Sequence, residues 1–327
     1  MSTTDGAAVV PAIRLEHVTK RYADGGAPAV DRLDLDVPAG ELVALVGPSG
    51  CGKTTILKMV NRLIEPTSGR ILVGGVDAAA LPEHELRRGI GYVIQQVGLF
   101  PHRKVRDNIA TVPALLGWDK ARTRDRVEEL CDLVGLDRSV LDRYPSALSG
   151  GQQQRVGVAR ALAADPPVLL MDEPYSAVDP VVRARLQDDL LELQQRLHKT
   201  IVLVTHDIDE AIKLADRVAL LNVGGVLEQF GPPDELLRAP ASEFVERFLG
   251  RDRALKRLSR LTVADLTDEA LDPTPPGLDG VPLSAEVTLR DALDALLGSE
   301  TGQLRVLDDD GQVRGTVTVE VIGERLR

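Results

Sequence analysis

The stretch Gly47-Pro48-Ser49-Gly50-Cys51-Gly52-Lys53-Thr54-Thr55 follows the apolar run 42–46 and leads into a second largely apolar run, 56–63. Its spacing fits the phosphate-binding pattern G-x-x-x-x-G-K-[ST]. Glycines let successive backbone N–H groups converge on an anion, and the start of the next helix adds the positive end of its dipole. We expect Lys53 to reach the outer phosphates of a triphosphate and the Thr54 hydroxyl to hold Mg²⁺. A plain glycine-rich turn is disfavoured, because strand, lysine and threonine are all in register.

The totals describe a chain large enough for one main core and a second, smaller domain. It has 327 residues, 43% of them hydrophobic, and a net charge of −11. Such an acidic chain has no overall basic field for nucleic acid, although a local basic patch stays open. No apolar run approaches the ~18 residues of a membrane helix, so we expect any membrane role to come through a partner.

Cysteine use and the N-terminal residues indicate the compartment. There are two cysteines, Cys51 and Cys131, and the first lies inside the phosphate loop. A structural disulfide there would distort the loop, so we expect a reducing cytoplasm. Residues 1–11 contain no basic residue and no apolar core. We therefore expect no secretory signal in them.

Polar residues follow three further apolar runs and are candidates for the chemistry. Asp172 and Glu173 end the run 168–171, where one carboxylate can organise Mg²⁺ and its neighbour can polarise a water molecule. Gln95 follows the run 90–94, and an amide oxygen there either binds Mg²⁺ or water or is simply solvated. His206 follows the run 201–204, where α/β folds place ligands, although a satisfied polar residue would fit equally well.

A second anion-binding helix start lies about a hundred residues beyond the first. Ser149 is a good N-cap residue, Gly150 and Gly151 follow it, and we expect a helix over 153–164. One nucleotide cannot easily fill both places in one subunit. Upstream, the Tyr22 ring either stacks on a base or only packs at a strand end.

The remaining pattern predicts alternating strands and helices. We expect an edge strand over 13–18 and helical structure through most of 100–141 and 232–249. Further predicted strands are 30–37, 70–76, 217–223 and 226–230, and further helices are 82–88, 181–197 and 208–214. Past residue 250 we expect a helix over 289–297 and strands over 304–307 and 313–319, with a linker at 272–277 and a tight turn at 308–311.

Together these motifs resemble one family, the ATP-binding subunits of ABC transporters, over about residues 13–250. The phosphate loop looks like Walker A, and Leu148-Ser149-Gly150-Gly151-Gln152 looks like the LSGGQ signature. Asp172-Glu173 looks like the end of Walker B with the catalytic glutamate. Other family positions are matched by Gln95 (Q-loop), Ser176 and Asp179 (D-loop), His206 (switch histidine) and Tyr22 (adenine-stacking aromatic).

The resemblance implies an α/β P-loop NTPase core with an antiparallel β subdomain and a helical subdomain at about 99–164. It implies a head-to-tail dimer of two copies that sandwiches ATP. One copy would supply Tyr22 and Gly47 to Thr55, and the other Leu148 to Gln152. Glu173, His206 and Gln95 would be catalytic, and Thr54, Gln95 and Asp172 would hold Mg²⁺. Integral membrane permease subunits, and a substrate-binding protein through the complex, are implied partners, with no nucleic acid. The chain would sit on the cytoplasmic face of the membrane.

Residues 90–102 resemble the Q-loop region of importers for quaternary-amine osmoprotectants such as glycine betaine, choline or carnitine. An importer ATPase for another small solute (an amino acid, a polyamine or an oxyanion) is the alternative. A soluble ABC ATPase that acts on DNA or ribosomes would usually carry a coiled-coil insertion or two cassettes, and neither is present. A nucleotide-sensing regulator with vestigial hydrolysis is disfavoured by the intact Glu173 and His206.

The tail, 258–327, resembles a single CBS motif with the order β-α-β-β-α and would form a small α+β region. Importers of this type often carry two such motifs, so we expect the tails of two copies to pair. A tail that only packs on the ATPase domain is the alternative.

Overall fold

The phosphate loop follows an inner strand of a six-stranded sheet in the computed structural model of the chain. The model describes residues 10–22, 26–95, 98–176, 178–266, 271–272, 282–307 and 312–326. The sheet has the order β10-β9-β3-β8-β7-β6, and every residue of β3, β7 and β8 is buried. Its strands are β3 (Leu42–Val46), β6 (Ile90–Val93), β7 (Val168–Asp172), β8 (Thr200–Thr205), β9 (Arg217–Asn222) and β10 (Val226–Gly231).

Parallel pairing brings the candidate residues to one edge of this sheet. β6, β7, β8, β3 and β9 are paired in parallel, and only β10 runs antiparallel to its neighbour. The carboxyl ends of the parallel strands therefore meet at one edge, where the phosphate loop, Gln95, Glu173 and His206 emerge. In open α/β sheets this is the edge at which ligands bind. The predicted α/β class is confirmed.

A four-stranded antiparallel sheet has the order β2-β1-β4-β5. The prediction of an edge strand at 13–18 is wrong, because β1 pairs with both β2 and β4. Alternation of polar and apolar residues indicates that one face of a strand is buried, but it does not indicate whether the strand pairs with one neighbouring strand or with two. The predicted strand 70–76 is two strands, because Gly74 and Gly75 turn with φ of 58° and 79°. The strands are β1 (Ile13–Lys20), β2 (Val30–Val37), β4 (Ser68–Val73) and β5 (Val76–Asp77).

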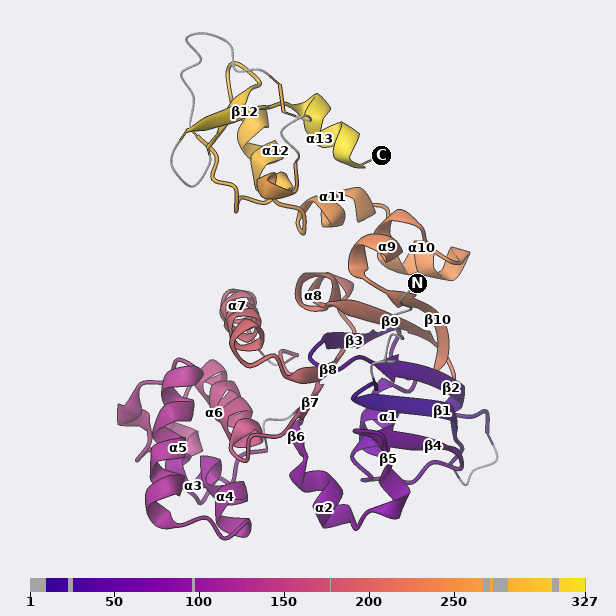
Figure 1. Ribbon diagram of the computed structural model, residues 1–327, viewed down its shortest axis with the longest axis vertical. Coiled ribbons are helices and arrows are strands. Elements are labelled where there is room, and N and C mark those ends of the chain that lie inside the picture. The colour runs from indigo at the N-terminus through magenta and orange to yellow at the C-terminus, as the bar shows by residue number, and fades with distance from the viewer. Residues whose placement is uncertain are drawn as a thin grey trace, which may run out of the picture. The chain divides into compact units, whose positions relative to one another are not determined.

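Helices gather beside the large sheet, on the side of β6 and β7 away from the small sheet (Figure 1). They are α3 (Val105–Ile109), α4 (Thr111–Leu115), α5 (Lys120–Leu133) and α6 (Gly150–Leu162), with short 3₁₀ turns at Arg138–Val140 and Pro145–Ala147. The mostly helical prediction for 100–141 is confirmed. α6 starts three residues before its predicted start, because the Ser149 side chain caps it. The other helices of this unit are α1 (Lys53–Val60), α2 (Glu83–Arg88), α7 (Pro180–Leu197) and α8 (Ile208–Leu214), with a 3₁₀ turn at Ala78–Ala80.

The chain divides into two compact units, Met1–Pro232 and Pro233–Arg327. The second has its own core, built around Leu258, Leu289, Val306 and Val317. Within it, buried Arg257 binds the Asp234 carboxylate and donates to the Leu326 carbonyl at 2.8 Å. Its elements are α9 (Pro233–Arg238), α10 (Glu243–Leu249), α11 (Arg253–Leu258), a 3₁₀ turn at Val263–Asp265, α12 (Leu289–Leu297), β11 (Leu304–Leu307), β12 (Val313–Val317) and α13 (Val319–Leu326).

The tail agrees only in part with the predicted order. The helix at 289–297 and the strand at 304–307 form as predicted, and β12 ends two residues early. Before α12, Leu283 meets Val306 only through an isolated parallel bridge. The predicted turn at 308–311 and residues 273–277 of the predicted linker lie outside the described residues. The boundary between a domain at 13–250 and a CBS-like tail at 258–327 stays a prediction.

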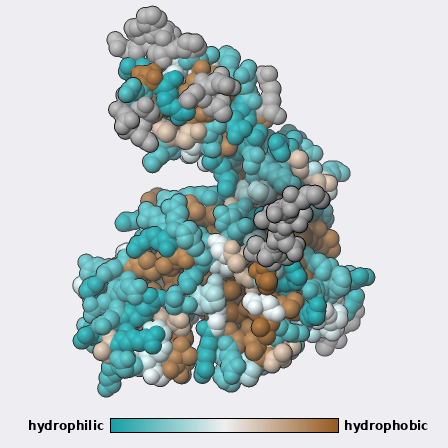
Figure 2. Space-filling model, viewed as in Figure 1, coloured by the Kyte–Doolittle hydropathy of each residue, from teal (hydrophilic) through white to brown (hydrophobic). Residues whose placement is uncertain are grey.

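Hydrophilic residues cover much of the face seen in Figure 2, with smaller hydrophobic areas between them. Within the described ranges, none of the helices combines the length and the apolar character needed to cross a membrane.

Candidate functional site

The phosphate loop is tight enough to require glycine at two positions. A Cβ on Gly47 would lie 2.1 Å from the Leu221 carbonyl oxygen, in β9. Gly52 has φ of 103° and would carry a Cβ 2.4 Å from the Ala29 carbonyl oxygen. Gly52 is also the N-cap of α1. The backbone therefore turns sharply into a helix start, as the sequence predicts for an anion site.

Lys53 lies inside the curl of the loop. Its side chain is only 6% exposed, and Nζ donates to the carbonyl oxygens of Gly47 at 2.7 Å and Pro48 at 3.1 Å. The Cys51 sulfur lies 3.7 Å from the same Nζ and is fully buried. The two carbonyl bonds hold the ammonium group inside the loop. Ser49, Gly50 and Thr55 are the other predicted nucleotide-binding residues of this segment. An anion placed there would meet a positive charge with little competing water.

Thr54 and Asp172 form the predicted metal side of the site. Thr54 Oγ1 donates to Asp172 Oδ1 at 2.9 Å, which joins the start of α1 to the end of β7. Burial raises the pKa of Asp172, and the hydrogen bond from Thr54 opposes that rise. Hydroxyl and carboxylate oxygens are the ligands that Mg²⁺ prefers, so the donor set fits this ion.

Glu173 is the point on which two other predicted residues converge. Gln95 Nε2 donates to Glu173 Oε2 at 3.2 Å, and His206 Nδ1 lies 3.3 Å from the same oxygen. The Glu173 backbone N–H donates to the Val204 carbonyl at 2.9 Å, so the residue is still anchored to β8. Its φ is 45°, a left-handed conformation that costs a non-glycine residue ~1–3 kcal/mol and is concentrated at functional sites.

Tyr22 lies beside Thr55, the last residue of the phosphate loop segment. Its hydroxyl is 3.4 Å from Thr55 Oγ1, and its ring centroid is 5.4 Å from Lys20 Nζ. The residue is 52% exposed, so a ring face is open to solvent beside the start of α1. The position is compatible with stacking on a base and incompatible with a purely buried packing role.

The signature residues are organised around the start of α6. Ser149 and Gln152 form a capping box: Gln152 N–H donates to Ser149 Oγ at 3.3 Å, and Ser149 N–H donates to Gln152 Oε1 at 3.1 Å. Leu148 is buried beneath the turn. Space is open where a Gly150 Cβ would point, whereas a Gly151 Cβ would lie 2.7 Å from Val182 Cγ1. Gly151 therefore serves the packing of α6 on α7, beyond the open helix start that the sequence predicts.

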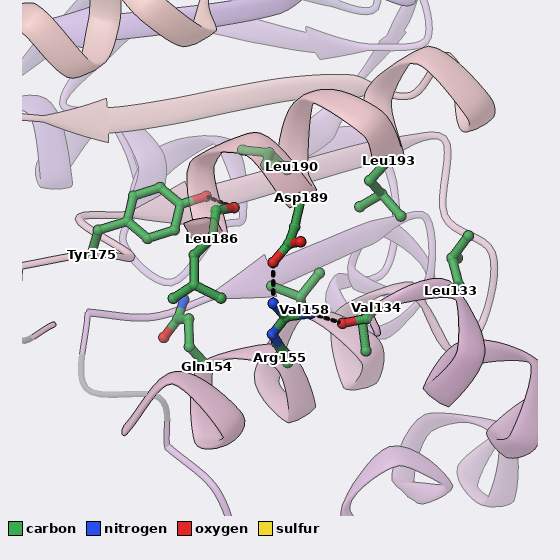
Figure 3. A pocket seen from close by; sticks show the side chains of 10 residues that line it. All are labelled: Leu133, Val134, Gln154, Arg155, Val158, Tyr175, Leu186, Asp189, Leu190 and Leu193. Carbon is green, nitrogen blue, oxygen red and sulfur yellow. Dashed lines mark hydrogen bonds and ion pairs between the residues drawn. The ribbon is translucent and has the colours of Figure 1, made fainter. Parts of the chain in front are cut away.

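The predicted D-loop residues Ser176 and Asp179 lie between Glu173 and helix α7. Ser176 Oγ donates to the Glu173 carbonyl at 3.0 Å, and Asp179 caps α7 by accepting from Val182 N–H at 3.0 Å. Farther along, Arg155 of α6 lies between the Asp189 carboxylate of α7 and the Val134 carbonyl, beside a cavity of about 30 Å³ (Figure 3). Arg155 thus ties the signature helix to the D-loop helix.

The described residues group the predicted site into two parts. Glu173, Gln95 and His206 are joined by direct contacts, and Asp172 is joined to Thr54 of the phosphate loop. The capping box of Ser149 and Gln152 instead joins these two signature residues to each other. The phosphate loop and the start of α6, which the sequence predicts as a second anion-binding helix start, thus belong to different contact groups among the described residues.

Sequence reasoning missed Tyr92, Thr205 and Glu210. Tyr92 pairs with Leu170 in the parallel register, on the face that Asp172 shares two residues later. Burial and a hydrogen bond to Asp172 raise the pKa of Tyr92. Thr205 donates to the Glu210 carboxylate beside His206. The strand register would have revealed Tyr92, but a single sequence does not give the register.

Comparison with known proteins relates this geometry to a family. Residues 30–176 match the family model described as ABC transporter. The chain is similar to the osmoprotectant import ATP-binding protein OsmV of Salmonella typhimurium, with 52% identity over 93% of this chain and 78% of that protein. It is also similar to the glycine betaine/carnitine/choline transport ATP-binding protein OpuCA of Bacillus subtilis, with 49% identity over 95% of this chain and 80% of that protein.

A solved structure of an ATP-binding cassette is also similar to this chain. An ATP-binding cassette in a dimeric, post-hydrolysis state bound to ADP and Pi matches with a TM-score of 0.60 and 33% identity. The match covers 67% of this chain and 98% of that one.

Proposed function

The chain belongs to the ABC transporter family of ATP-binding proteins, and we propose that it powers the import of a quaternary-amine osmoprotectant through a separate membrane permease. Members of this family bind ATP and couple its hydrolysis to transport. The observation that carries the choice of solute is the extent of the similarity. The two relatives named for osmoprotectants or for glycine betaine, carnitine and choline match over 93–95% of this chain, which includes most of the tail.

ATP would bind at the phosphate loop, with its adenine on the exposed Tyr22 ring. The loop N–H groups and Lys53 would hold the β- and γ-phosphates, and Lys53 would exchange its carbonyl partners for phosphate oxygens. Thr54, Asp172 and the amide oxygen of Gln95 would hold Mg²⁺, which neutralises phosphate charge when bound.

Glu173 would act as the general base. Its Oε2 would accept the proton of a water molecule as the water oxygen attacks the γ-phosphorus, and the bond to the β–γ bridging oxygen would break. Gln95 and His206 contact this same oxygen and would orient the carboxylate and contact the γ-phosphate. Ser176 holds the Glu173 backbone through its carbonyl.

The separate signature segment supports a composite site. We infer that two copies of the chain pair head to tail, so that Ser149, Gly150 and Gly151 of one copy face the ATP held by the other. The capping box uses the N–H groups of Ser149 and Gln152, and the open space at Gly150, in the first turn of α6, is suited to receive phosphate oxygens. The dimeric relative with bound ADP and Pi supports this arrangement.

The partners follow from the same family. Integral membrane permease subunits would recruit the chain to the cytoplasmic face of the membrane, and a substrate-binding protein would deliver the solute to the complex.

The tail has its own core, and we propose that residues 258–327 form a single CBS-like module that pairs between the two copies. Deleting 258–327 should then remove the dependence of transport on ionic strength. A truncated chain with unchanged dependence would contradict this role.

The test of the proposed function is uptake in a host that lacks other systems for these solutes. Deleting the coding sequence should abolish uptake of labelled glycine betaine, choline or carnitine and leave sulfate and amino-acid uptake intact. Re-expression of the chain should restore uptake, and the Glu173→Gln variant should not. Unchanged osmoprotectant uptake with loss of another solute would contradict the proposed substrate class.

A further inference from the structure

Glu210 is a buried carboxylate for which the proposed hydrolysis has no role. It lies in the first turn of α8, four residues after His206, and is only 7% exposed. Thr205, the last residue of β8, donates its hydroxyl proton to Glu210 Oε2. A carboxylate is costly to bury unless it accepts hydrogen bonds, so a buried glutamate beside a catalytic loop calls for a structural reason.

The Thr205 hydroxyl connects Glu210 to the backbone on the other side of His206. The Asp207 N–H donates to Thr205 Oγ1 at 3.0 Å. A hydroxyl has one proton, and here it goes to Glu210, so that an oxygen lone pair of Thr205 faces the Asp207 N–H. Asp207 in turn caps α8 by accepting from Asp209 N–H at 2.9 Å. Residues 205 and 207 are thus fixed by one directional chain of hydrogen bonds, the 207–205–210 relay.

His206 depends on this backbone for its position. Its side chain is 58% exposed, so the imidazole has little packing of its own. It nevertheless lies 3.3 Å from Glu173 Oε2. On a free loop the backbone and the ring would move together, whereas a fixed backbone holds Cβ in place and limits the ring to the positions that its staggered rotamers reach.

We propose that Glu210 is a positioning residue for ATP hydrolysis: through the 207–205–210 relay it fixes the backbone on both sides of His206 and holds the imidazole at Glu173. The inference rests on the proposed function, in which His206 and Glu173 act on the γ-phosphate. Arg183 Nη1 of α7 lies 4.0 Å from Asp207 Oδ2, which connects the relay to the helix that Asp179 caps.

Matched substitutions separate the relay from packing. Thr205→Val keeps the shape of this buried side chain but leaves the Asp207 N–H without its partner, whereas Thr205→Ser keeps the hydroxyl. Glu210→Leu removes the acceptor, whereas Glu210→Gln keeps an acceptor oxygen. The test uses the purified full-length chain, with single-turnover hydrolysis, ATP affinity by fluorescence titration, and folding by circular dichroism.

Thr205→Val and Glu210→Leu should each lower the hydrolysis rate by about 10- to 100-fold, because a small misplacement of a catalytic group is this costly. ATP affinity should stay within about twofold, since Tyr22 and the phosphate loop lie on other elements. Thr205→Ser and Glu210→Gln should restore most of the rate. The Thr205→Val/Glu210→Leu double variant should lose no more than the worse single variant, because both break one relay.

Three results would overturn this inference and leave the proposed function standing. Two of them are a normal rate in Thr205→Val while His206→Ala is impaired, and fully additive losses in the double variant. Equal loss of rate and of ATP affinity would also overturn it, because it would indicate general structural damage. A His206→Ala variant with a wild-type rate would remove His206 from the mechanism, and this inference with it. A chain that does not hydrolyse ATP at all would refute the proposed function itself.

Discussion

His206 Nδ1 lies 3.3 Å from Glu173 Oε2, so the residues that follow two neighbouring parallel strands, β8 and β7, meet at one carboxylate oxygen. Gln95, which follows the next strand, reaches that oxygen at 3.2 Å. Three strand ends therefore converge on one atom beside the phosphate loop. A carboxylate held in this way is suited to take a proton from a water molecule in a defined direction.

Glu173→Gln should slow hydrolysis by ~10²–10⁴-fold, because an amide cannot accept the proton from water. ATP binding should persist, since Lys53 and the loop N–H groups are unchanged. Single-turnover phosphate release and ATP titration measure the two effects. The matched control is Glu192→Gln, an exposed glutamate of α7, which should leave both unchanged. A near-normal rate in Glu173→Gln would exclude Glu173 as the base.

Asp172→Asn should stabilise the nucleotide-free chain at neutral pH. Burial raises the pKa of Asp172, so the folded chain holds this proton more tightly than the unfolded chain. The stability that the group contributes is present below the unfolded pKa and is lost as the pH rises through the folded pKa. The variant avoids that loss.

Calorimetry without Mg²⁺ should show an increase in Tm of about 2–4 °C for Asp172→Asn at pH 7, equivalent to ~1 kcal/mol, and the difference should shrink in acid. Asp125→Asn, at an exposed residue of α5, is the control. A lower Tm for Asp172→Asn at pH 7 would show that its hydrogen bonds outweigh the burial of its charge.

Arg155→Ala should destabilise the helical region. The substitution leaves the Asp189 carboxylate and the Val134 carbonyl without their partner at the α6–α7 contact (Figure 3). We expect a loss of about 1–3 kcal/mol in the free energy of unfolding, measured with denaturant. Arg124→Ala removes an ion pair that is about 70% exposed on both sides and should change stability by less than about 0.5 kcal/mol. Equal effects of the two substitutions would contradict the structural role of Arg155.

A bulky maleimide should inactivate the chain slowly through Cys51, and ATP should protect against it. Both thiols are fully buried, so reaction at Cys51 requires the phosphate loop to open. Burial raises the pKa of Cys131 to about 11, which leaves it little thiolate near neutral pH. Rates of activity loss in wild type and Cys51→Ser check this. Equal inactivation of Cys51→Ser would indicate Cys131 instead.

Short segments with clear boundaries could be predicted from the sequence. β2, β3, α8, α12 and β11 span the predicted residues. Each is bounded by turn residues or carries a strong apolar period, and both signals are local. The start of α6 and the division of 70–76 into β4 and β5 depend on a side-chain cap and on two positive φ angles, which residue propensities describe only weakly.

The candidate site could be predicted as a set of residue types but not as a set of contacts. Glu173 meets Gln95 and His206 because β7 pairs in parallel with both β6 and β8, and pairing between strands that lie far apart along the chain is not encoded in any local pattern. β1 is internal for the same reason: its second partner, β4, comes some fifty residues later. The role proposed for Glu210 depends on the direction in which the Thr205 hydroxyl donates its proton, and no local sequence pattern encodes that direction.

The central claim is that the phosphate loop and the signature segment of one chain belong to two different sites of a dimer. Mixing Lys53→Ala with Ser149→Arg tests it most directly, by single-turnover ATP hydrolysis. Each variant alone has two defective sites and should be inactive. In a mixed dimer, both defects fall in one site, and the other site has an intact loop and an intact signature. We predict that mixing restores hydrolysis, and a mixture as inactive as the separate variants would contradict the composite site.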